Sequence, residues 1–533
     1  MEQGFRASMN WLHTWAGVVI GALLFAIFWM GTLSVFDREI DRWMMPMTRL
    51  APADAPVKLD ALRDILLSDM EANREANGEE GARNGFIIPP AERAPMARVG
   101  YRGKDGFKSK FVDPASGEVL PEPGTKGGTG FIFPFHYSLH LRANAGGVGY
   151  WLVGLAGMAM MALLVSGVIV HVKIFKDFFT FRTDRKTPRV ALDLHNVTGV
   201  LALPFHFLIT LSGLIIFVTI YFPAASDILY DKDEKAYFQE AFGSYSRDRA
   251  GQPGSIGSLD AMAAEAVRLW GDGTRPFFVR IHHPGDANGY VEMRQSYDNK
   301  VTMSLDRVYF DAASGAVLHH HIGKPVLNSQ RFISGLHFIQ FKHWTLRWVY
   351  FILGLSGCVL IVTGFLFWLE SRRKRHTQQG LRGVRIVEGL TIGSTTGIIL
   401  ATLGFFIVNR LLPLGLEHRA NIEFWGFFAI WVLSFAHAWM RTKRGWIEQC
   451  YATAAAALLA VLLNAITTGD HMLRTLMQGN WPVFGMDSMM LAGGTIALAT
   501  AIRLQRRQTV AAQQAVSSPS RTIRTDKPEQ QHA

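Results

Sequence analysis

Cysteine is almost absent from this sequence, and its scarcity excludes several kinds of site. The 533 residues contain two cysteines, Cys358 and Cys450, which lie inside one apolar run and at the start of another. Two such cysteines build no disulfide framework, and neither stands in the Cys-x-x-Cys-His pattern that attaches a c-type haem. A covalently attached haem is therefore excluded.

Signatures of nucleotide cofactors and of hydrolytic catalysis are missing too. No Gly-x-Gly-x-x-Gly follows an expected strand, no phosphate-binding loop occurs, and no polar segment has the size of a soluble flavin domain. The sequence therefore encodes no flavin or NAD site, and electrons would have to come from a partner or from quinol. It also shows no His-Glu-x-x-His or Ser–His–Asp pattern, so proteolysis has no support.

Long apolar runs are abundant. Hydrophobic residues make up 49% of the chain, and eight runs are close to the ~20 residues that a membrane-spanning helix needs. We expect a polytopic α-helical membrane protein with spans at 12–36, 148–172, 194–222, 346–369, 388–411, 422–440, 447–466 and 484–503. The last four spans form a C-terminal module, and the polar tail after Arg507 is expected to be disordered.

The formal net charge of +11 comes largely from basic residues beside the ends of these spans. The clusters are Lys173–Arg189, Arg372–Arg375, Arg441–Arg444 and Arg503–Arg507. This positive-inside pattern indicates membrane orientation rather than nucleic-acid binding, and it predicts cytoplasmic N- and C-termini. Arg6 precedes a first run that has no small-residue cleavage site, which predicts an uncleaved signal anchor.

Two polar insertions, at about 37–145 and 223–340, follow odd-numbered spans and are expected on the periplasmic side. Amphipathic helices open at Leu59-Asp60-Ala61 in the first and at Leu259-Asp260-Ala261 in the second. Each insertion then ends in a strand–turn–strand pattern, Phe111–Leu120 and Tyr309–Leu318, with an Asp to start the turn and a Gly for a positive-φ position. We therefore expect two small α+β modules.

The chain also repeats itself, which predicts an internal duplication of about the first 370 residues. Between spans one and three, 195 − 13, 199 − 17 and 213 − 31 all give 182. The matched residues are His13 with His195, Gly17 with Gly199, Gly31 with Gly213, His136 with His337, and Ser166-Gly167 with Thr363-Gly364. Because both copies start inside, the repeats are parallel and related by a pseudo-twofold axis along the membrane normal.

Such an axis brings equivalent residues face to face and predicts two imidazole pairs. His13 and His195 form one pair at the cytoplasmic ends of their spans, and His136 and His337 form another at the outer entry to theirs. Two neutral imidazoles on facing helices, with nothing else nearby to complete a tetrahedral zinc site, suit axial ligation of a b-type haem. One haem near each membrane face would make an electron path across the bilayer.

Further histidines leave the ligand set open. His140 lies four residues after His136 on the same helical face, so it could replace His136 as a ligand but could not oppose it across one haem. His171, at the inner end of span two, and His206 are further candidates at the inner site. In an unbroken helix His206 would share a face with His195 roughly 16 Å away, unless a proline between them kinks the span.

Polar residues on the outer side have simpler interpretations. The clusters His282-His283 and His319-His320-His321 are expected to be solvated strand ends. Arg142 and Arg347, near the outer pair, are candidates for holding haem propionates or for marking the headgroup boundary.

Several runs in order resemble one family. They are Asp113–Leu120, Phe135–Leu141, Ser166–His171 and Asp193–His206, together with the Leu-His-x-x-x-Gly opening of spans one and three. They look like the PepSY-associated transmembrane (PepSY-TM) family of bacterial inner-membrane proteins, over about residues 5–372. That family includes iron-regulated proteins and ferric-siderophore reductases that bind b-type haem through transmembrane histidines. The resemblance implies haem ligation by His13, His136, His195 and His337, and electron transfer to a periplasmic metal complex.

The resemblance implies an iron-uptake reductase, and the two imidazole pairs predict that it binds two b-type haems. The inner haem would take electrons from quinol or a cytoplasmic reductase, and the outer haem would deliver them to a periplasmic ferric-siderophore or other metal chelate. Two other classes stay open. A non-enzymatic binding protein would use the outer modules to hold a peptide or protein and would be colourless, whereas a transporter would relay protons through His206.

Overall fold

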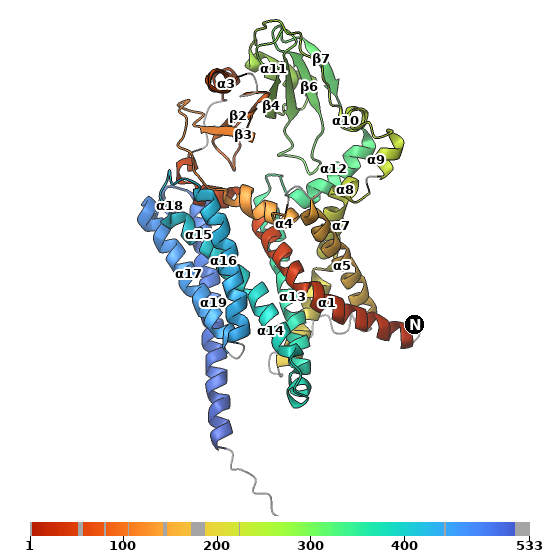
Figure 1. Cartoon of the computed structure of the whole chain (residues 1–533), viewed down its shortest axis with the longest axis vertical. Coiled ribbons are helices and arrows are strands. Elements are labelled where there is room, and N and C mark those ends of the chain that lie inside the picture. Colours follow the sequence, from red (N-terminus) through yellow and green to blue (C-terminus); the bar gives the residue numbers. More distant parts are fainter. Residues whose placement is uncertain are drawn as a thin grey trace, which may run out of the picture.

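The computed structural model describes residues 3–51, 57–78, 82–104, 106–141, 147–171, 187–222, 224–441 and 444–517. Within these ranges the chain forms a bundle of long helices with one antiparallel sheet at one end (Figure 1). We call that end the sheet side. The N-terminus and the end of the last helix lie toward the other end, which we call the opposite side (Figure 1).

Seven helical segments of the described chain are long and apolar enough to cross a membrane, and a bent helix pair makes an eighth. They confirm the number and the order of the expected spans, although some helices extend well beyond the expected ends. In chain order the spans are α1 (Gln3–Ser34), α5 (Val148–Val170), α6 (Thr187–Leu201) with α7 (Leu203–Ile216), α13 (Trp344–Gln378), α14 (Gly383–Ser394) with α15 (Thr396–Leu411), α16 (Arg419–Met440), α17 (Gly445–Thr468) and α19 (Trp481–Ser517).

The third span is bent by 65° between α6 and α7. Pro204 stands in the first turn of α7, where it has no N–H to donate to Val200, so the helical hydrogen-bond ladder is interrupted there. The bend puts His195 in α6 and His206 in α7. Of the two possibilities that the sequence leaves open, an unbroken helix and a span kinked at its proline, the structure has the kinked span.

The last helix is longer than the sequence predicts. α19 continues through Ser517, so residues 508–517 are helical rather than disordered. Residues 518–533 and most of the basic loop after span two, 172–186, lie outside the described residues.

The sheet has seven strands in the order β3-β2-β1-β4-β5-β6-β7, and every neighbouring pair is antiparallel. The strands are β1 (Gly85–Ile88), β2 (Ala97–Gly103), β3 (Gly106–Val112), β4 (Pro276–His282), β5 (Tyr290–Gln295), β6 (Arg307–Asp311) and β7 (Val317–His321). β1 of the first insertion pairs with β4 of the second, with Ile87 opposite Val279. The two insertions, expected as separate modules, therefore build one continuous sheet.

The expected amphipathic helices, α3 (Leu59–Asn77) and α11 (Leu259–Trp270), cover one face of this sheet and share its apolar core. An aspartate in the first turn of each helix caps the N-terminus of the other helix. The Asp60 carboxylate accepts hydrogen bonds from the Leu259 N–H (2.6 Å) and the Ser258 hydroxyl (2.6 Å), while the Asp260 carboxylate accepts from the Leu59 N–H (2.8 Å). The first turn of each helix is thus stabilised by the other insertion.

The two expected hairpins form to different extents. β6 and β7 pair across a turn in which the Asp311 carboxylate accepts from the Ser314 N–H at 2.9 Å and Gly315 has a φ of +72°. In the first insertion Gly117 has a φ of +74°, but Val112 and Val119 form only an isolated bridge beyond the turn.

Short helices make up much of the rest of the fold. They are α2 (Asp37–Met44), η1 (Pro46–Thr48), η3 (Gly128–Ile132), α4 (Phe133–Ser138), α8 (Val218–Tyr221), α9 (Ala224–Leu229), α10 (Glu234–Phe242), α12 (Pro325–Phe338) and α18 (Met472–Met477). α4 and α12 lie between the bundle and the sheet (Figure 1).

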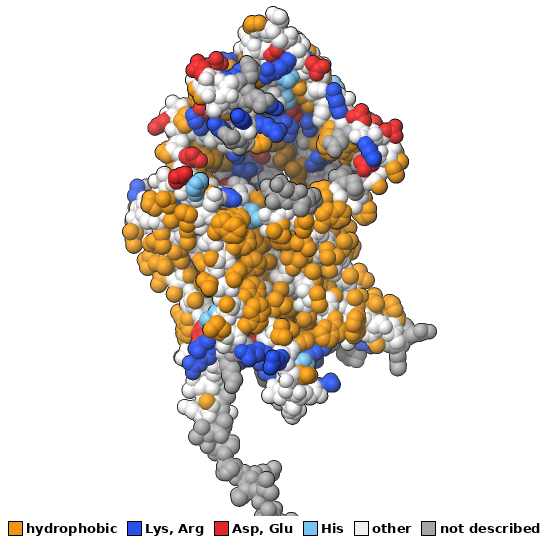
Figure 2. All heavy atoms as spheres, in the orientation of Figure 1, with side chains coloured by type: hydrophobic (Ala, Val, Ile, Leu, Met, Phe, Trp, Pro, Cys, Tyr) orange, Lys and Arg blue, Asp and Glu red, His pale blue; other side chains and the backbone are white. Residues whose placement is uncertain are grey.

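An apolar band crosses the face of the bundle that Figure 2 shows. Leu155, Val432 and Ile496 of this band are more than half exposed, as expected of side chains that contact lipid rather than water. Lys and Arg side chains gather below the band, at the opposite side (Figure 2). The chain is a multi-pass membrane protein.

Candidate functional site: two imidazole pairs

The four histidines expected as ligands come together in two pairs. His13 of α1 and His195 of α6 have ring centres 6.2 Å apart and ring planes at 79°. His136 of α4 and His337 of α12 have ring centres 5.9 Å apart and planes at 25°. The His13–His195 pair, the inner pair, lies toward the opposite side, and the His136–His337 pair, the outer pair, lies toward the sheet side.

Each of these imidazoles is anchored through Nδ1 to a backbone carbonyl of a neighbouring helix. The bonds join His13 to Leu163 (3.1 Å), His195 to Leu360 (2.8 Å), His136 to Ile27 (2.9 Å) and His337 to Ile209 (2.9 Å). A neutral ring that donates from Nδ1 keeps Nε2 as an acceptor, which is the tautomer that a metal ligand needs. Among the described residues no hydrogen-bond partner reaches any of the four Nε2 atoms.

Each ring also lies against a glycine four residues after its carbonyl acceptor. These glycines, which we call the notch glycines, are Gly167 for His13, Gly364 for His195, Gly31 for His136 and Gly213 for His337. A Cβ at Gly31 or Gly213 would lie 2.6 or 2.9 Å from the imidazole, too close for any side chain. At Gly167 and Gly364 the corresponding distance is 3.2 Å, which is tighter than an ordinary contact.

Hydroxyl groups beside three notch glycines support the same arrangement. The Ser166 hydroxyl lies 3.1 Å from Nδ1 of His13, and the Ser212 hydroxyl lies 3.1 Å from Nδ1 of His337. The Thr363 hydroxyl donates to the Leu360 carbonyl, which is the acceptor for His195. Such partners behind the ring hold its orientation and tautomer.

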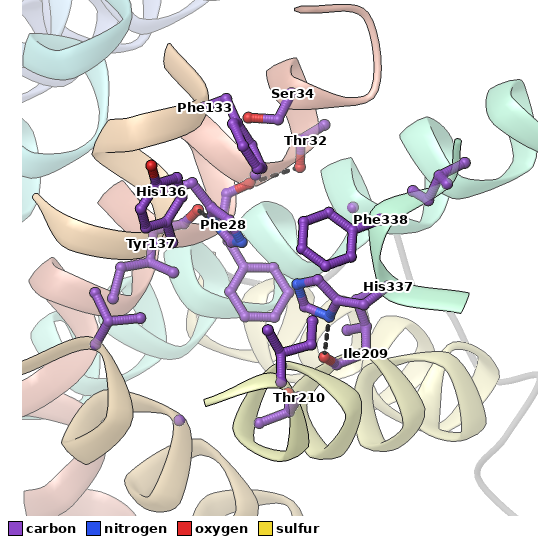
Figure 3. Close-up of a pocket in the computed structure, with 18 of the residues that line it drawn as sticks. Phe28, Thr32, Ser34, Phe133, His136, Tyr137, Ile209, Thr210, His337 and Phe338 are labelled. Atoms are coloured by element: carbon purple, nitrogen blue, oxygen red, sulfur yellow. Dashed lines mark hydrogen bonds between the residues drawn. The ribbon is translucent and has the colours of Figure 1, made fainter. Parts of the chain in front are cut away.

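The outer pair lines a cavity of ≈ 430 Å³, a size typical of small-molecule sites (Figure 3). Its walls come from α1, α2, α4, α5, α7, α8, α12 and α13, and both Gly31 and Gly213 contribute to them. Aromatic rings such as Phe28 and Phe338 line it as well (Figure 3). Of the described lining residues only Asp37 carries a formal charge, so the cavity is predominantly apolar.

These residues fit a haem with two histidine ligands. No group of three or more His, Cys, Asp or Glu side chains that could hold a metal occurs in the described chain, so neither pair is part of a zinc-type cluster. If two histidines bind one metal ion from opposite sides, each metal–nitrogen bond is roughly 2 Å long. With the additional distance from each nitrogen to its ring centre, the two ring centres then lie about 6 Å apart. The ring separations of 5.9 and 6.2 Å agree with that span.

Comparison with known families matches residues 10–371 to the PepSY-associated TM region. The match contains both imidazole pairs and all four notch glycines. The chain belongs to this family. A similar protein, the uncharacterized protein PA4219 of Pseudomonas aeruginosa, is 26% identical over 388 residues, which cover 68% of this chain and 92% of that protein.

The PepSY-TM match ends within α13, so the last four spans lie outside it. This agrees with the expectation that the resemblance covers about residues 5–372. They nevertheless pack closely on the family region, because one buried cluster joins Phe131 and Phe135 to Phe405 and Phe427.

His140 does not face His337. α4 ends at Ser138, and Leu139 and His140 both have positive φ, 51° and 56°. The expectation that His140 shares a helical face with His136 is therefore wrong. Nε2 of His140 bonds to the Phe131 carbonyl at 2.9 Å, and its ring stacks on the Phe131 ring with centres 4.8 Å apart.

His171 and His206 lie apart from both pairs. His171 ends α5, and its ring contacts no other imidazole in the described part of the chain. His206 is fully buried in α7, with Nε2 3.3 Å from the Ser356 hydroxyl and its ring 6.0 Å from that of Phe28. Its Nδ1 has no hydrogen-bond partner among the described residues.

The remaining candidates on the sheet side have structural contacts. Arg347 is 1% exposed, and its guanidinium donates to the carbonyls of Val35 (3.0 Å) and Phe341 (3.1 Å). Arg142 lies outside the described residues. In the strand cluster His319 is exposed, as expected, whereas His321 is buried.

Proposed function

We propose that this PepSY-TM protein binds two b-type haems, one at each imidazole pair, and carries electrons across a bacterial inner membrane to a ferric siderophore or another ferric chelate. The observation that carries the proposal is the common environment of His13, His136, His195 and His337. Each Nδ1 is anchored and each ring lies against a notch glycine. No partner among the described residues reaches any of the four Nε2 atoms, so these atoms are available to bind a metal.

The proposed orientation follows from charge. Basic side chains gather at the opposite side, so the positive-inside rule makes that side cytoplasmic and the sheet periplasmic (Figure 2). Quinol or a cytoplasmic reductase would then deliver electrons near the inner pair. The matched contacts of the two halves support an origin of the first 370 residues by duplication.

The protein positions the haems and determines their surroundings. When bound, haem supplies one-electron redox chemistry. The carbonyls that accept from Nδ1 orient the four rings and increase the basicity of Nε2. His13 and Gly31 stand 18 residues apart in α1, about 27 Å of helix, so one span serves a site near each membrane face. A ferric substrate reduced on the sheet side is held less firmly by hard oxygen ligands, and its release follows.

The reduced-minus-oxidised absorbance spectrum of the purified protein tests the proposal, with pyridine-haemochrome quantitation of haem per chain. We expect about two b-type haems. His195→Ala is expected to lose one of them because it removes a ligand of the inner pair, whereas His140→Ala, whose ring lies outside both pairs, keeps both. A colourless protein after expression with ample haem would refute the proposal and leave the sheet as a binding surface.

A further inference from the structure

The face of the sheet that points away from α3 and α11 is basic and aromatic. Strand register places Phe86 opposite Arg280, Arg280 opposite Glu292, and Arg294 opposite Arg307. Because alternate residues of a strand share a face, these side chains lie on one side of the sheet. We call it the arginine face; its arginines are Arg98, Arg102, Arg280, Arg294 and Arg307.

Part of the positive charge on the arginine face is not compensated. Glu292 accepts hydrogen bonds from Arg294 (2.7 Å) and Arg307 (3.0 Å). Arg98, Arg102 and Arg280 form no ion pair with a carboxylate in the described part of the chain. Burial, opposed by Glu292, holds the pKa of Arg280 below its usual range. A partly buried cation without a counter-ion favours an anionic ligand.

Aromatic rings hold these guanidinium groups in place. Phe86 and Phe278 stack with ring centres 6.2 Å apart at 13°. The guanidinium of Arg98 lies 6.0 Å from the Phe86 ring centre, and those of Arg280 and Arg294 lie 5.2 and 4.8 Å from that of Phe278. Cation–π contact pre-orients the planar forks, which match the oxygen pairs of carboxylates and catecholates.

The arginine face points toward the outer imidazole pair. Arg93, in the loop between β1 and β2, donates to the carboxylates of Glu39 (2.8 Å) and Asp37 (3.3 Å), so α2 lies close to the sheet. Asp37 also lines the cavity that contains the outer pair. Figure 2 shows a recess between the sheet and the apolar band, with Lys and Arg side chains on its upper wall.

We propose that the arginine face is a binding site for small polyanionic metal chelates with planar oxygen-donor groups, and that it selects them over neutral chelates. That this ligand is also the electron acceptor rests on the proposed function. The anion site itself depends only on the charge and geometry of the sheet.

Titration calorimetry on the full-length protein in detergent tests the site with a redox-inert probe, the trianionic gallium(III) tris(catecholate) complex, at mildly alkaline pH. The control ligand is neutral gallium(III) tris(maltolate). We expect the trianion to bind at least about tenfold more tightly, and its affinity to fall as salt is added. Equal affinity for the two complexes would overturn the proposal.

Matched variants locate the binding. Arg98→Gln with Arg280→Gln is expected to weaken binding of the trianion at least about tenfold. Arg102→Gln changes a side chain that makes no cation–π contact in the described part of the chain, and it is expected to weaken binding less. Arg268→Gln changes an exposed arginine of α11, beyond the other face, and should leave the affinity unchanged. Wild-type affinity in the double variant would refute the site.

Haem content separates this proposal from the proposed function. A haem-free protein that binds the trianion through Arg98 and Arg280 refutes only the reductase. A protein with about two haems that does not distinguish the two gallium complexes refutes only the anion site.

Discussion

At the scale of single residues, the notch glycines are the strictest requirement of the site. A methyl group at Gly213 would lie 2.9 Å from the His337 ring, so Gly213→Ala must displace that imidazole. We expect the variant to lose the outer haem and keep the inner one, which lowers the pyridine-haemochrome value by about half. Gly485→Ala is the control, because a Cβ there has no neighbour within 4 Å. Two haems per chain in Gly213→Ala would show that the notch is not needed.

The pairing of the four histidines could be predicted from the sequence, but the contacts of the glycines with them could not. The offset of 182 already related His13 to His195 and Gly31 to Gly213. What links a histidine to its glycine is a contact between different helices, which no spacing within one helix encodes. One signal was present: His13 and Gly31 are 18 residues apart, five helical turns, and therefore share a face. His140 was misplaced because the end of α4 has no proline or glycine to mark it.

At the scale of elements, α3 and α11 depend on each other through their first turns. Asp60→Ala removes the carboxylate that accepts from the Leu259 N–H and the Ser258 hydroxyl, and the loss of such a cap costs about 1 kcal/mol. We expect a lower unfolding temperature of the sheet and faster amide hydrogen exchange at the start of α11, in the other insertion. Glu71→Gln, an exposed change on α3, is the control. Faster exchange confined to α3 would contradict the reciprocal cap.

The same cap predicts a pH dependence. Burial alone would raise the pKa of Asp60, but the bonds from Ser258 and Leu259 and the charge of Arg63 outweigh burial and hold that pKa below its usual value. A lowered carboxyl pKa stabilises the fold above the unfolded value of about 3.9, and this stability is lost as the pH falls through the folded pKa. The protection of the amides at the start of α11, that is, their exchange rate relative to the intrinsic rate at the same pH, should therefore fall below about pH 4 in the wild type. Asp60→Asn should lack this acid-dependent step.

The elements themselves were largely predictable, whereas their assembly was not. Hydrophobic runs located the spans, and Asp60 and Asp260 marked the two amphipathic helices. The pairing of β1 with β4 joins residues almost 200 positions apart, and strand patterns do not say which edges meet. The 65° bend required a judgement about one proline that the sequence leaves open.

At the scale of the whole molecule, a buried polar network connects the four C-terminal spans with the part of the chain that matches the family, residues 10–371. The Trp43 indole N–H of α2 donates to the Asp487 carboxylate of α19 at 2.7 Å, and the Asn464 amide of α17 donates to it at 3.2 Å. The Arg410 guanidinium of α15 lies 4.4 Å from the Trp43 ring centre. α2 begins at Asp37, which lines the cavity, so the added spans support one wall of the outer site.

Trp43→Phe tests this support. The change keeps an aromatic ring beside Arg410 but removes the donor to Asp487, and the loss of a buried hydrogen bond to a charged group costs about 1.5–3 kcal/mol. We expect a lower thermal unfolding temperature, with the inner haem retained and the outer haem bound less tightly. Trp425→Phe, at a side chain that is 67% exposed, is the matched control. If Trp43→Phe lowered stability but left both haems equally tight, the C-terminal spans would brace the fold without shaping the outer site.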